Sequence, residues 1–453
     1  MAKKVPASPF VPVEEQPYSI PENWFWVKLE FVCSGPITDG THKTPKYCEK
    51  TDGVPFVSAK DVTSEYIDWS NVKYIVPDLH QELYKRLAPQ KNDILLAKNG
   101  TTGVAALVET NDIFDLYVTI AVLRPNIGII LPKFMYRLIN SPICKNQFNS
   151  HLTGIGVPNL HLRDIKNVSI PLPPLSEQRR IVDCIESLFA KLDEAKEKAQ
   201  AVVDGFELRK SVILHKAFTG ELTVQWRKEH GVGLDSWEIK PLMEVASLQT
   251  GLMKGKRYEG KTVFLPYLRV ANVQDGFLDL KEIKEIEVSP SSVSRYLLKR
   301  GDVLFTEGGD FDKLGRGTVW EEEIPNCLHQ NHIFVVRPDE SVLNPYFLSY
   351  QAGSKYGKTY FMSCSKQTTN LASINSTQLK GFPVRLPSLA EQIEIISLIT
   401  NLLNLEQQAK EAAEAVLVQI DTMKKAILAR AFRGELGTND PAEEWAGTLV
   451  ELI

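Results

Sequence analysis

The sequence changes character at Pro173-Pro174-Leu175-Ser176-Glu177-Gln178, and a second copy of this motif, Pro387-Ser388-Leu389-Ala390-Glu391-Gln392, lies roughly 210 residues later. Before each copy, short β-rich runs alternate with loops that are rich in glycine, aspartate, asparagine and threonine. After each copy, apolar residues recur in heptads. The motif therefore marks, twice, the boundary between a globule of mixed α and β structure and a long helix.

The two halves of the chain also match over further segments, and the matches keep the same order. The matched pairs are Trp24–Leu29 with Trp237–Leu242, Val54–Val57 with Leu265–Leu268, Asn92–Leu96 with Gly301–Phe305, Ile120–Pro125 with Ile333–Pro338, and Ala217–Leu222 with Ala431–Leu436. So many matches in register indicate the duplication of a whole domain. A solenoid is excluded because the repeated unit is too long and occurs only twice.

Each heptad pattern predicts a helix of about 40 residues, or ~60 Å. The predicted seam of the first helix is Ile181, Ile185, Leu188, Leu192, Val202, Phe206 and Ile213, and that of the second is Ile395, Ile399, Leu402, Val416, Ile420, Met423 and Ile427. Arg209 and Glu406 interrupt the two seams. Prolines precede each helix, and Gly220 and Gly434 suit its C-terminal end.

Two such seams in one chain can bury each other as a coiled coil. A whole globule connects the two helices, and a duplication with two-fold symmetry favours an antiparallel pair. The alternative is that each helix docks on its own globule. The expected fold class is α+β, with two mixed α/β domains related by internal duplication and joined by two long helices that form an antiparallel coiled coil.

Composition excludes several classes of protein. The 453 residues are 43% hydrophobic, and no apolar run approaches the ~20 residues that a membrane span needs. The first residues include lysines but no apolar core of a secretory signal, so we expect a cytoplasmic location. The six cysteines form no C-x-x-C pair, which favours reduced packing residues over disulfides or a zinc knuckle. Because the chain has a net charge of −4, it cannot bind DNA by its overall charge, and any DNA contact must be local or shared with a basic partner.

The motifs of the obvious enzymes are missing from the sequence. An adenine methyltransferase needs a glycine-rich cofactor loop and a segment of the D/N-P-P-Y/F type. The nearest match, Asn344-Pro345-Tyr346-Phe347, lacks the second proline, and the same register of the first half reads Leu131-Pro132-Lys133-Phe134. No phosphate-binding loop occurs, and His329 and His332 lack a third metal ligand. We therefore expect no catalytic residue and no metal site.

Each globule leads through L-x-E-Q into a long helix that ends A-F-x-G-E-L. Over nearly the whole chain, this arrangement resembles the specificity subunit (HsdS) of type I restriction-modification systems. Thr38–Tyr47 in the first globule resembles sequences found in target-recognition domains of that family, as do Glu307–Asp310 and Leu314–Gly317 in the second. The resemblance implies a non-catalytic recognition subunit that reads a bipartite DNA target, with one half-site for each globule and the helices setting the spacer.

The resemblance also implies partners. These are double-stranded DNA, two modification (methyltransferase) subunits and, in the complex that cleaves, two restriction subunits. S-adenosylmethionine, ATP and Mg²⁺ would bind in those partners and not in this chain. Two alternatives stay open: a standalone DNA methyltransferase, and a helical scaffold that does not bind DNA.

The expected domain boundaries follow from the motifs. They are an N-terminal arm (1–17), target-recognition domain 1 (18–175), a central long helix (176–222), a linker (223–235), target-recognition domain 2 (236–388), a C-terminal long helix (389–437) and a tail (438–453).

Loops that are rich in polar residues and glycine are the candidate DNA contacts, because Arg, Lys, Asn, Gln, Ser and Thr side chains distinguish bases at groove edges, while Lys, Arg and backbone amides attract phosphates. In the first globule they are Thr41, His42, Lys43, Lys46, Lys98, Asn99, Thr101, Thr102, Asn159 and His161. In the second they are Lys254, Lys256, Arg257, Lys313, Arg316, Lys366, Gln367, Thr368 and Asn370. The loop at 254–261 is locally basic, in contrast to the net charge of the chain.

Overall fold

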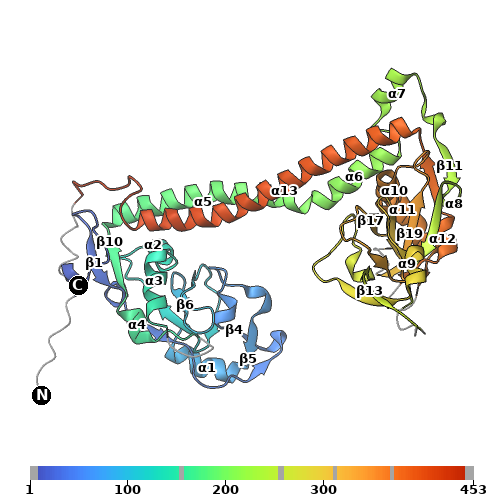
Figure 1. The fold of residues 1–453 in the computed structure, drawn as a ribbon. Helices are drawn as coiled ribbons and strands as arrows, with labels where there is room; N and C mark the ends of the chain where they lie inside the picture. Colours follow the sequence, from blue (N-terminus) through green and yellow to red (C-terminus); the bar gives the residue numbers. More distant parts are fainter. Residues whose placement is uncertain (1–8, 153–157, 254–259, 310–313, 368–371, 444–453) are drawn as a thin grey trace, which may run out of the picture. The chain divides into compact units, whose positions relative to one another are not determined.

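The computed structural model describes residues 9–152, 158–253, 260–309, 314–367 and 372–443 (Figure 1). The chain divides into two compact units. Unit 1 comprises Met1–Ala199 and Ala415–Ile453, and unit 2 comprises Gln200–Glu414. Each unit therefore holds one globule together with a part of both long helices.

The globule of unit 1 is built on two sheets. The first has the strand order β2-β9-β6-β7, and the second β3-β5-β4-β8, in which β8 is parallel to β4. The strands of the first are Thr38–Asp39, Ile120–Leu123, Ile94–Ala97 and Ala105–Leu107, and those of the second are Tyr47–Cys48, Lys73–Ile75, Val54–Val57 and Asp115–Leu116. Strand β1 (Phe25–Lys28) pairs with β10 (Ser169–Leu172). Helices α1 to α4 are Pro77–Arg86, Pro132–Ile139, Pro142–Ser150 and Leu162–Lys166.

The globule of unit 2 repeats this plan. Its sheets are β12-β19-β15-β17 and β14-β13-β18, in which β18 is parallel to β13, and β11 pairs with β22. The strands of the first sheet are β12 (Ala246–Thr250), β19 (Ile333–Pro338), β15 (Val303–Thr306) and β17 (Gly317–Val319). Those of the second are β14 (Lys284–Val288), β13 (Val263–Leu268) and β18 (Leu328–His329). The remaining pair is β11 (Glu238–Pro241) with β22 (Pro383–Leu386). Helices α8 to α12 are Leu242–Val245, Pro290–Tyr296, Pro345–Gly353, Lys355–Cys364 and Ser376–Lys380. The predicted duplication is confirmed.

A small sheet in unit 2 has the strand order β16-β21-β20, which are Gly308–Gly309, Ala372–Ser373 and Lys366–Gln367. Short 3-10 turns occur at Val13–Glu15, Leu29–Val32, Lys50–Asp52, Ala59–Asp61, Trp69–Asn71, Leu234–Ser236 and Val270–Asn272. Among the described residues, no helix is long and apolar enough to cross a membrane.

The second long helix is continuous, whereas the first is broken. Helix α13 runs from Leu389 to Ala431, but the predicted helix over 176–222 is α5 (Leu175–Asp204) followed by α6 (Phe206–Phe218). The break falls at Gly205, where Arg209 folds back and donates to the Val202 carbonyl at 2.7 Å. A side chain that competes for a helix carbonyl, next to a glycine, is a known cause of kinks. The predicted linker contains a further helix, α7 (Val224–His230).

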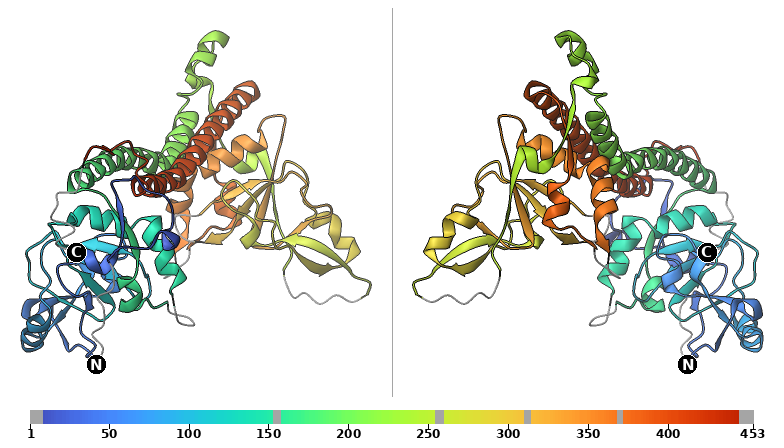
Figure 2. Two further views of the ribbon diagram at one scale, coloured as in Figure 1. Left: turned by 90° about the vertical axis from the view of Figure 1, so that its left-hand side faces the viewer. Right: turned by 90° about the vertical axis from the view of Figure 1, so that its right-hand side faces the viewer.

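The long helices pair antiparallel within each unit, as predicted. In unit 1, Lys424 of α13 pairs with Asp193 of α5, and Asp421 pairs with Lys196 at 3.9 Å, so numbers fall along one helix as they rise along the other. In unit 2, Arg209 and Glu406, which interrupt the two seams, pair with each other at 2.6 Å. Figures 1 and 2 both show the C-terminal part of α13 beside α5.

The predicted seam residues differ in burial. Ile181, Ile185, Ile395, Ile399 and Ile420 are buried, whereas Leu188, Leu192, Val202, Phe206, Ile213, Leu402 and Ile427 are half-buried. Val416 and Met423 are 39% and 50% exposed, so a core position for these two is wrong. A pair of helices covers each seam from one direction only, which leaves the flanks of the seam open to solvent.

The ends of the helices pack on the globules. Ile181 and Ile185 belong to the core of the first globule, together with Phe432 from the end of α13. Ile395 and Phe218 occupy the same places in the core of the second globule. The alternative of docking on the globule thus holds at the helix ends, alongside the coiled coil.

The Glu-Gln pair of the motif explains why the helix starts where it does. The buried Gln178 side chain accepts from the Leu131 N–H at 2.8 Å and donates to the carbonyls of Ile129 and Pro173, both at 2.9 Å. Glu177 accepts from the Trp24 indole N–H at 2.8 Å. One short motif thereby joins the first strand, the turn before α2 and the start of α5.

Unit 2 repeats these bonds. Gln392 accepts from the Asn344 N–H at 2.8 Å and donates to the carbonyls of Val342 and Pro387 at 2.8 and 2.9 Å. Glu391 accepts from the Trp237 indole at 2.9 Å.

We predict that Gln392→Leu lowers the stability of the protein by about 3 kcal/mol or more, because a buried N–H and two carbonyls lose their partner and each such loss costs about 1 to 3 kcal/mol. The matched control is Gln408→Leu, at an exposed position of the same helix, which should stay within about 0.5 kcal/mol. Urea unfolding followed by circular dichroism measures both. Equal losses in the two variants would contradict the role given to the motif.

Candidate nucleic-acid interface

Loops that are far apart in the sequence meet at one end of the β2-β9-β6-β7 sheet. The Asn99 side-chain amide donates to the Asn159 side-chain oxygen at 2.9 Å, and the Leu160 N–H donates to the Lys98 carbonyl at 2.8 Å. Lys98 also reaches the loop after β2, since its Nζ lies 2.9 Å from Asp39 Oδ2. Residues 39–43, 98–102 and 158–161 are called the first loop surface below.

Asp39 organises this surface from a buried position. Besides Lys98, it contacts His42 Nε2 at 3.3 Å, and its backbone carbonyl accepts from Arg86 at 2.9 Å. Arg86 also donates to the Gly40 carbonyl at 3.1 Å. Arg86 was not predicted, because nothing in the sequence near the end of α1 distinguishes this arginine from a solvated one. Its side chain is 48% exposed, so it can both hold the loop and face a phosphate.

A close approach of backbones shapes the loop after β2. A Cβ added at Gly40 would overlap the carbonyl oxygen of Leu116, and one added at Gly251 of unit 2 would overlap that of His329. In both units the residue after the glycine donates its N–H to that same carbonyl, at 2.9 Å. The two glycines are therefore equivalent, although the sequence comparison did not align them. The presence of a glycine at equivalent positions of both halves could have identified this loop from the sequence.

Burial divides the candidates of the first globule. Thr41 and Lys98 are 4% and 8% exposed, so they position the loops and are not available to a DNA groove, which corrects the expectation for these two. The exposed candidates are His42, Lys43, Lys46, Thr101 and His161, and the half-buried ones are Asn99, Thr102 and Asn159. Lys43 pairs with Glu82 on the surface.

In the second globule, the small sheet brings two candidate loops together. Strand β21 pairs with Gly308–Gly309 on one side and with Lys366–Gln367 on the other. Arg316 is half-buried, and its Nη1 lies 3.4 Å from Gln274 Oε1. The remaining candidates, Lys254, Lys256, Arg257, Lys313, Thr368 and Asn370, lie outside the described residues.

The two histidines of the His-Gln-Asn-His segment have separate environments. His329 is fully buried and donates from Nδ1 to the Tyr296 carbonyl at 3.1 Å, and its burial lowers the pKa to about 4. His332 is exposed and pairs with Glu307. Within the part of the chain that the structure describes, no cluster of His, Cys, Asp and Glu side chains could hold a metal ion.

A second candidate surface lies on the helices of unit 1. An open cavity of about 380 Å³ is lined by Leu188, Lys191, Leu192, Met423, Ala426, Ile427 and Arg430, and is called the helix-pair groove below. It is apolar at its centre and basic at its margin. An exposed apolar strip with a charged rim is typical of a protein interface.

A family model described as the type I restriction modification DNA specificity domain matches residues 21–203 and, again, residues 235–415. The chain belongs to this family. Each matched range contains one globule and the first part of the long helix that follows it, so the family's repeating unit is the duplicated unit seen in the sequence.

Similar proteins support this assignment over the whole chain. The EcoKI specificity subunit of Escherichia coli (strain K12) is 25% identical over 443 residues, covering 96% of this chain and 92% of that protein. The StySPI specificity subunit of Salmonella potsdam is 23% identical over 440 residues, with 96% and 92% covered. The structure of the HsdS subunit from Thermoanaerobacter tengcongensis has the same fold, with a TM-score of 0.61, 24% identity, and 93% of this chain and all (100%) of that chain covered.

We predict that Gly40→Ala impairs recognition of only one half-site, and that Gly251→Ala impairs only the other. Each new Cβ overlaps a backbone carbonyl, so its loop must move, and a lost base contact costs about 1 to 3 kcal/mol of discrimination. Binding of the assembled complex to targets mutated in one half-site measures this preference. Gly35→Ala is the control, because a Cβ there meets nothing within 4 Å. Equal loss of both preferences from either variant would contradict modular reading.

Proposed function

We propose that this specificity subunit reads a bipartite DNA sequence, with one half-site contacted by each globule. The observation that carries the proposal is the equivalence of the two globules, each of which gathers polar loops at the same end of its main sheet. The close approach at Gly40 and at Gly251 gives both loops the same starting geometry. Two modules built alike but carrying different loop residues suit two half-sites of different sequence.

We propose further that the chain has no catalytic role of its own. The segment that most resembles a methyltransferase motif serves as the start of α10, where the Asn344 side chain accepts from the Tyr346 N–H at 2.9 Å and Pro345 occupies the first turn. Methyl transfer is assigned to modification subunits that bind S-adenosylmethionine. ATP and Mg²⁺ are assigned to the partner subunits as well.

Two modification subunits, and two restriction subunits in the cleaving complex, complete the proposed assembly. The helix-pair groove is the proposed contact for a modification subunit, because its apolar side chains lie on the long helices and outside the first loop surface. The net charge of −4 supports a shared DNA interface, since a basic partner would add phosphate contacts to those of this chain.

We predict that the chain alone methylates no DNA, and that adding a modification subunit produces methylation of a bipartite target.

Met423→Glu, which places a charge in the helix-pair groove, should weaken binding of the modification subunit at least tenfold, because an unpaired carboxylate would be desolvated in the contact. Calorimetric titration and a methyl-transfer assay measure the two effects. Thr422→Glu adds the same charge beside the groove and serves as control. Methylation by the chain alone would refute the non-catalytic role, and equal binding of both variants would refute the groove.

We also predict that the helices set the length of the spacer between the half-sites. One extra heptad in both α5 and α13 keeps the seams in phase and adds roughly 10 Å of helix, which corresponds to about three base pairs of DNA. Mapping methylated adenines across a genome should then give unchanged half-sites with a longer spacer. An unaltered spacer in a folded, active variant would show that another part of the complex sets the distance.

A further inference from the structure

In unit 1, the segment before β1 adds a partial strand to the free edge of β1. The Val11 N–H donates to the Trp26 carbonyl at 2.9 Å, and the Lys28 N–H donates to the Pro9 carbonyl at 3.1 Å. Residues 9–18 are called the arm below. Beneath the arm, Trp26 is only 2% exposed.

Tyr18 anchors the other end of the arm. Its hydroxyl donates to the Phe432 carbonyl at 2.9 Å, at the C-terminal end of α13. Its ring packs edge-on against Trp26, with centroids 4.9 Å apart, and the Arg433 guanidinium lies 5.1 Å from the ring centroid. Between the edge strand and this anchor the arm carries Glu14 and Glu15. The arm is thus an extended segment with an aromatic anchor and carboxylates.

In unit 2, no such segment lies on the equivalent surface among the residues that the structure describes. Strand β11 corresponds to β1 by the match of Trp237 with Trp24, and among the described residues it pairs only with β22. Ile239, at the position of Trp26, is 65% exposed. The Phe218 carbonyl, at the position of the Phe432 carbonyl, accepts instead from Arg385 at 2.7 Å.

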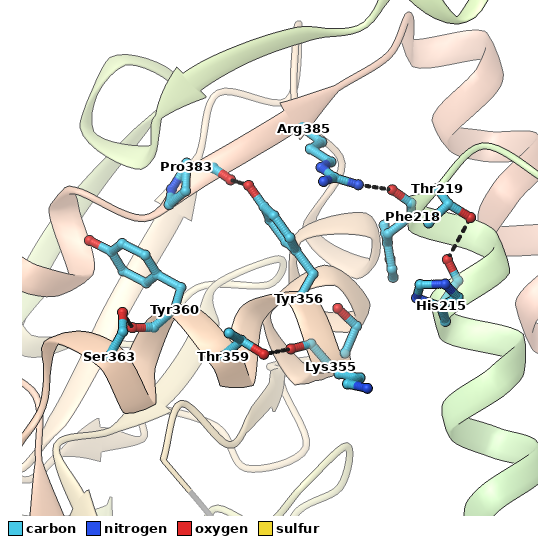
Figure 3. A pocket seen from close by; sticks show the side chains of 11 residues that line it. His215, Phe218, Thr219, Lys355, Tyr356, Thr359, Tyr360, Ser363, Pro383 and Arg385 are labelled. Atoms are coloured by element: carbon cyan, nitrogen blue, oxygen red, sulfur yellow. Dashed lines mark hydrogen bonds between the residues drawn. The ribbon is translucent and has the colours of Figure 1, made fainter.

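A cavity of about 440 Å³ in unit 2 is lined by Phe218 and Thr219 (Figure 3). These residues are at the positions of Phe432 and Arg433, which contact Tyr18 in unit 1. The cavity is enclosed by the end of α6, by α11 and by β22. Its apolar wall includes Phe218, Tyr356 and Pro383. The volume and the ring-lined wall suit an aromatic side chain.

The charged residues that line this cavity are basic. His215, Lys355 and Arg385 line it, and no lining residue is acidic. Arg385 lies 4.3 Å from the ring centroid of Tyr356, so its guanidinium is held at the wall, where it can face an incoming group. A basic rim favours a segment that carries carboxylates.

We propose that the free edge of β11 and this cavity together form a docking site for an extended segment of a partner protein. The segment would pair with the backbone of Ile239 at the edge of β11, because Pro241, at the position of Lys28, has no N–H to donate. It would place an aromatic side chain in the cavity and set carboxylates against the basic rim. Edge pairing with a pocket for a side chain is a general mode of peptide recognition. A partner is favoured over a second copy of this chain, because the arm of each copy is already engaged on its own β1.

The probe for this site is a synthetic peptide with the sequence of residues 9–20, labelled with fluorescein and titrated with the full chain. We expect saturable binding in fluorescence anisotropy. A peptide with alanine in place of Tyr18 should bind at least tenfold more weakly, because the cavity then stays unfilled.

Two variants of the chain locate the binding. Thr359→Trp fills the cavity from the exposed side of α11, and Ile239→Glu puts a charge on the exposed face of β11. Each should weaken peptide binding at least tenfold, while Thr400→Trp, at an exposed position of α13, should leave it unchanged. Both variants change exposed side chains, and circular dichroism checks that they fold.

Three results would overturn the proposal. The first is no binding of the peptide at about 1 mM, where even weak docking is measurable. The second is undiminished binding by both Thr359→Trp and Ile239→Glu, which would place the peptide at β1 by exchange with the arm. The third is self-association of the chain that the peptide dissolves, which would assign the site to a second copy.

Discussion

The architecture depends on one buried pair of polar side chains at the start of each long helix. Glu177 and Gln178, and their counterparts Glu391 and Gln392, are at most 1% exposed and fully occupied by hydrogen bonds. A buried amide without partners would cost several kcal/mol, so the helix cannot leave its globule without breaking these bonds. The same pair therefore sets both where each helix begins and which strand and turn it touches.

Ion pairs inside the globules determine which cations remain for a ligand. Arg124 with Asp93 and Arg337 with Asp302 are equivalent two-pronged pairs, one in each globule, and Lys98 is bound to Asp39. These pairs hold strand ends and loops in place, which suits preorganised recognition, because a loop that is already ordered loses less entropy on binding. These basic side chains are therefore engaged within the fold and not available as free cations to a ligand.

The duplication leaves the two units unequal in one respect that bears on assembly. The arm covers the edge of β1, whereas no described residue pairs with the corresponding edge of β11, so the units share a framework but differ in what can bind beside it. The segment before β11 comes directly from α6 and α7, whereas residues 9–11, before β1, lie along the strand and bond to it.

The sequence by itself determined the duplication, the antiparallel helices and the junction motif, because repeats, heptads and proline-glycine boundaries are local patterns that survive without knowledge of contacts. Only the tertiary structure decided the break at Gly205, the exposure of Val416 and Met423, the burial of Thr41 and Lys98, the place of Arg86 and the equivalence of Gly40 with Gly251. Each of these depends on which distant backbone or side chain comes close. A lysine in a Gly-rich loop looks the same in sequence whether it faces solvent or pairs with a distant aspartate. Lys98 pairs with Asp39, some sixty residues earlier in the chain. Packing decides which of these two environments the lysine has.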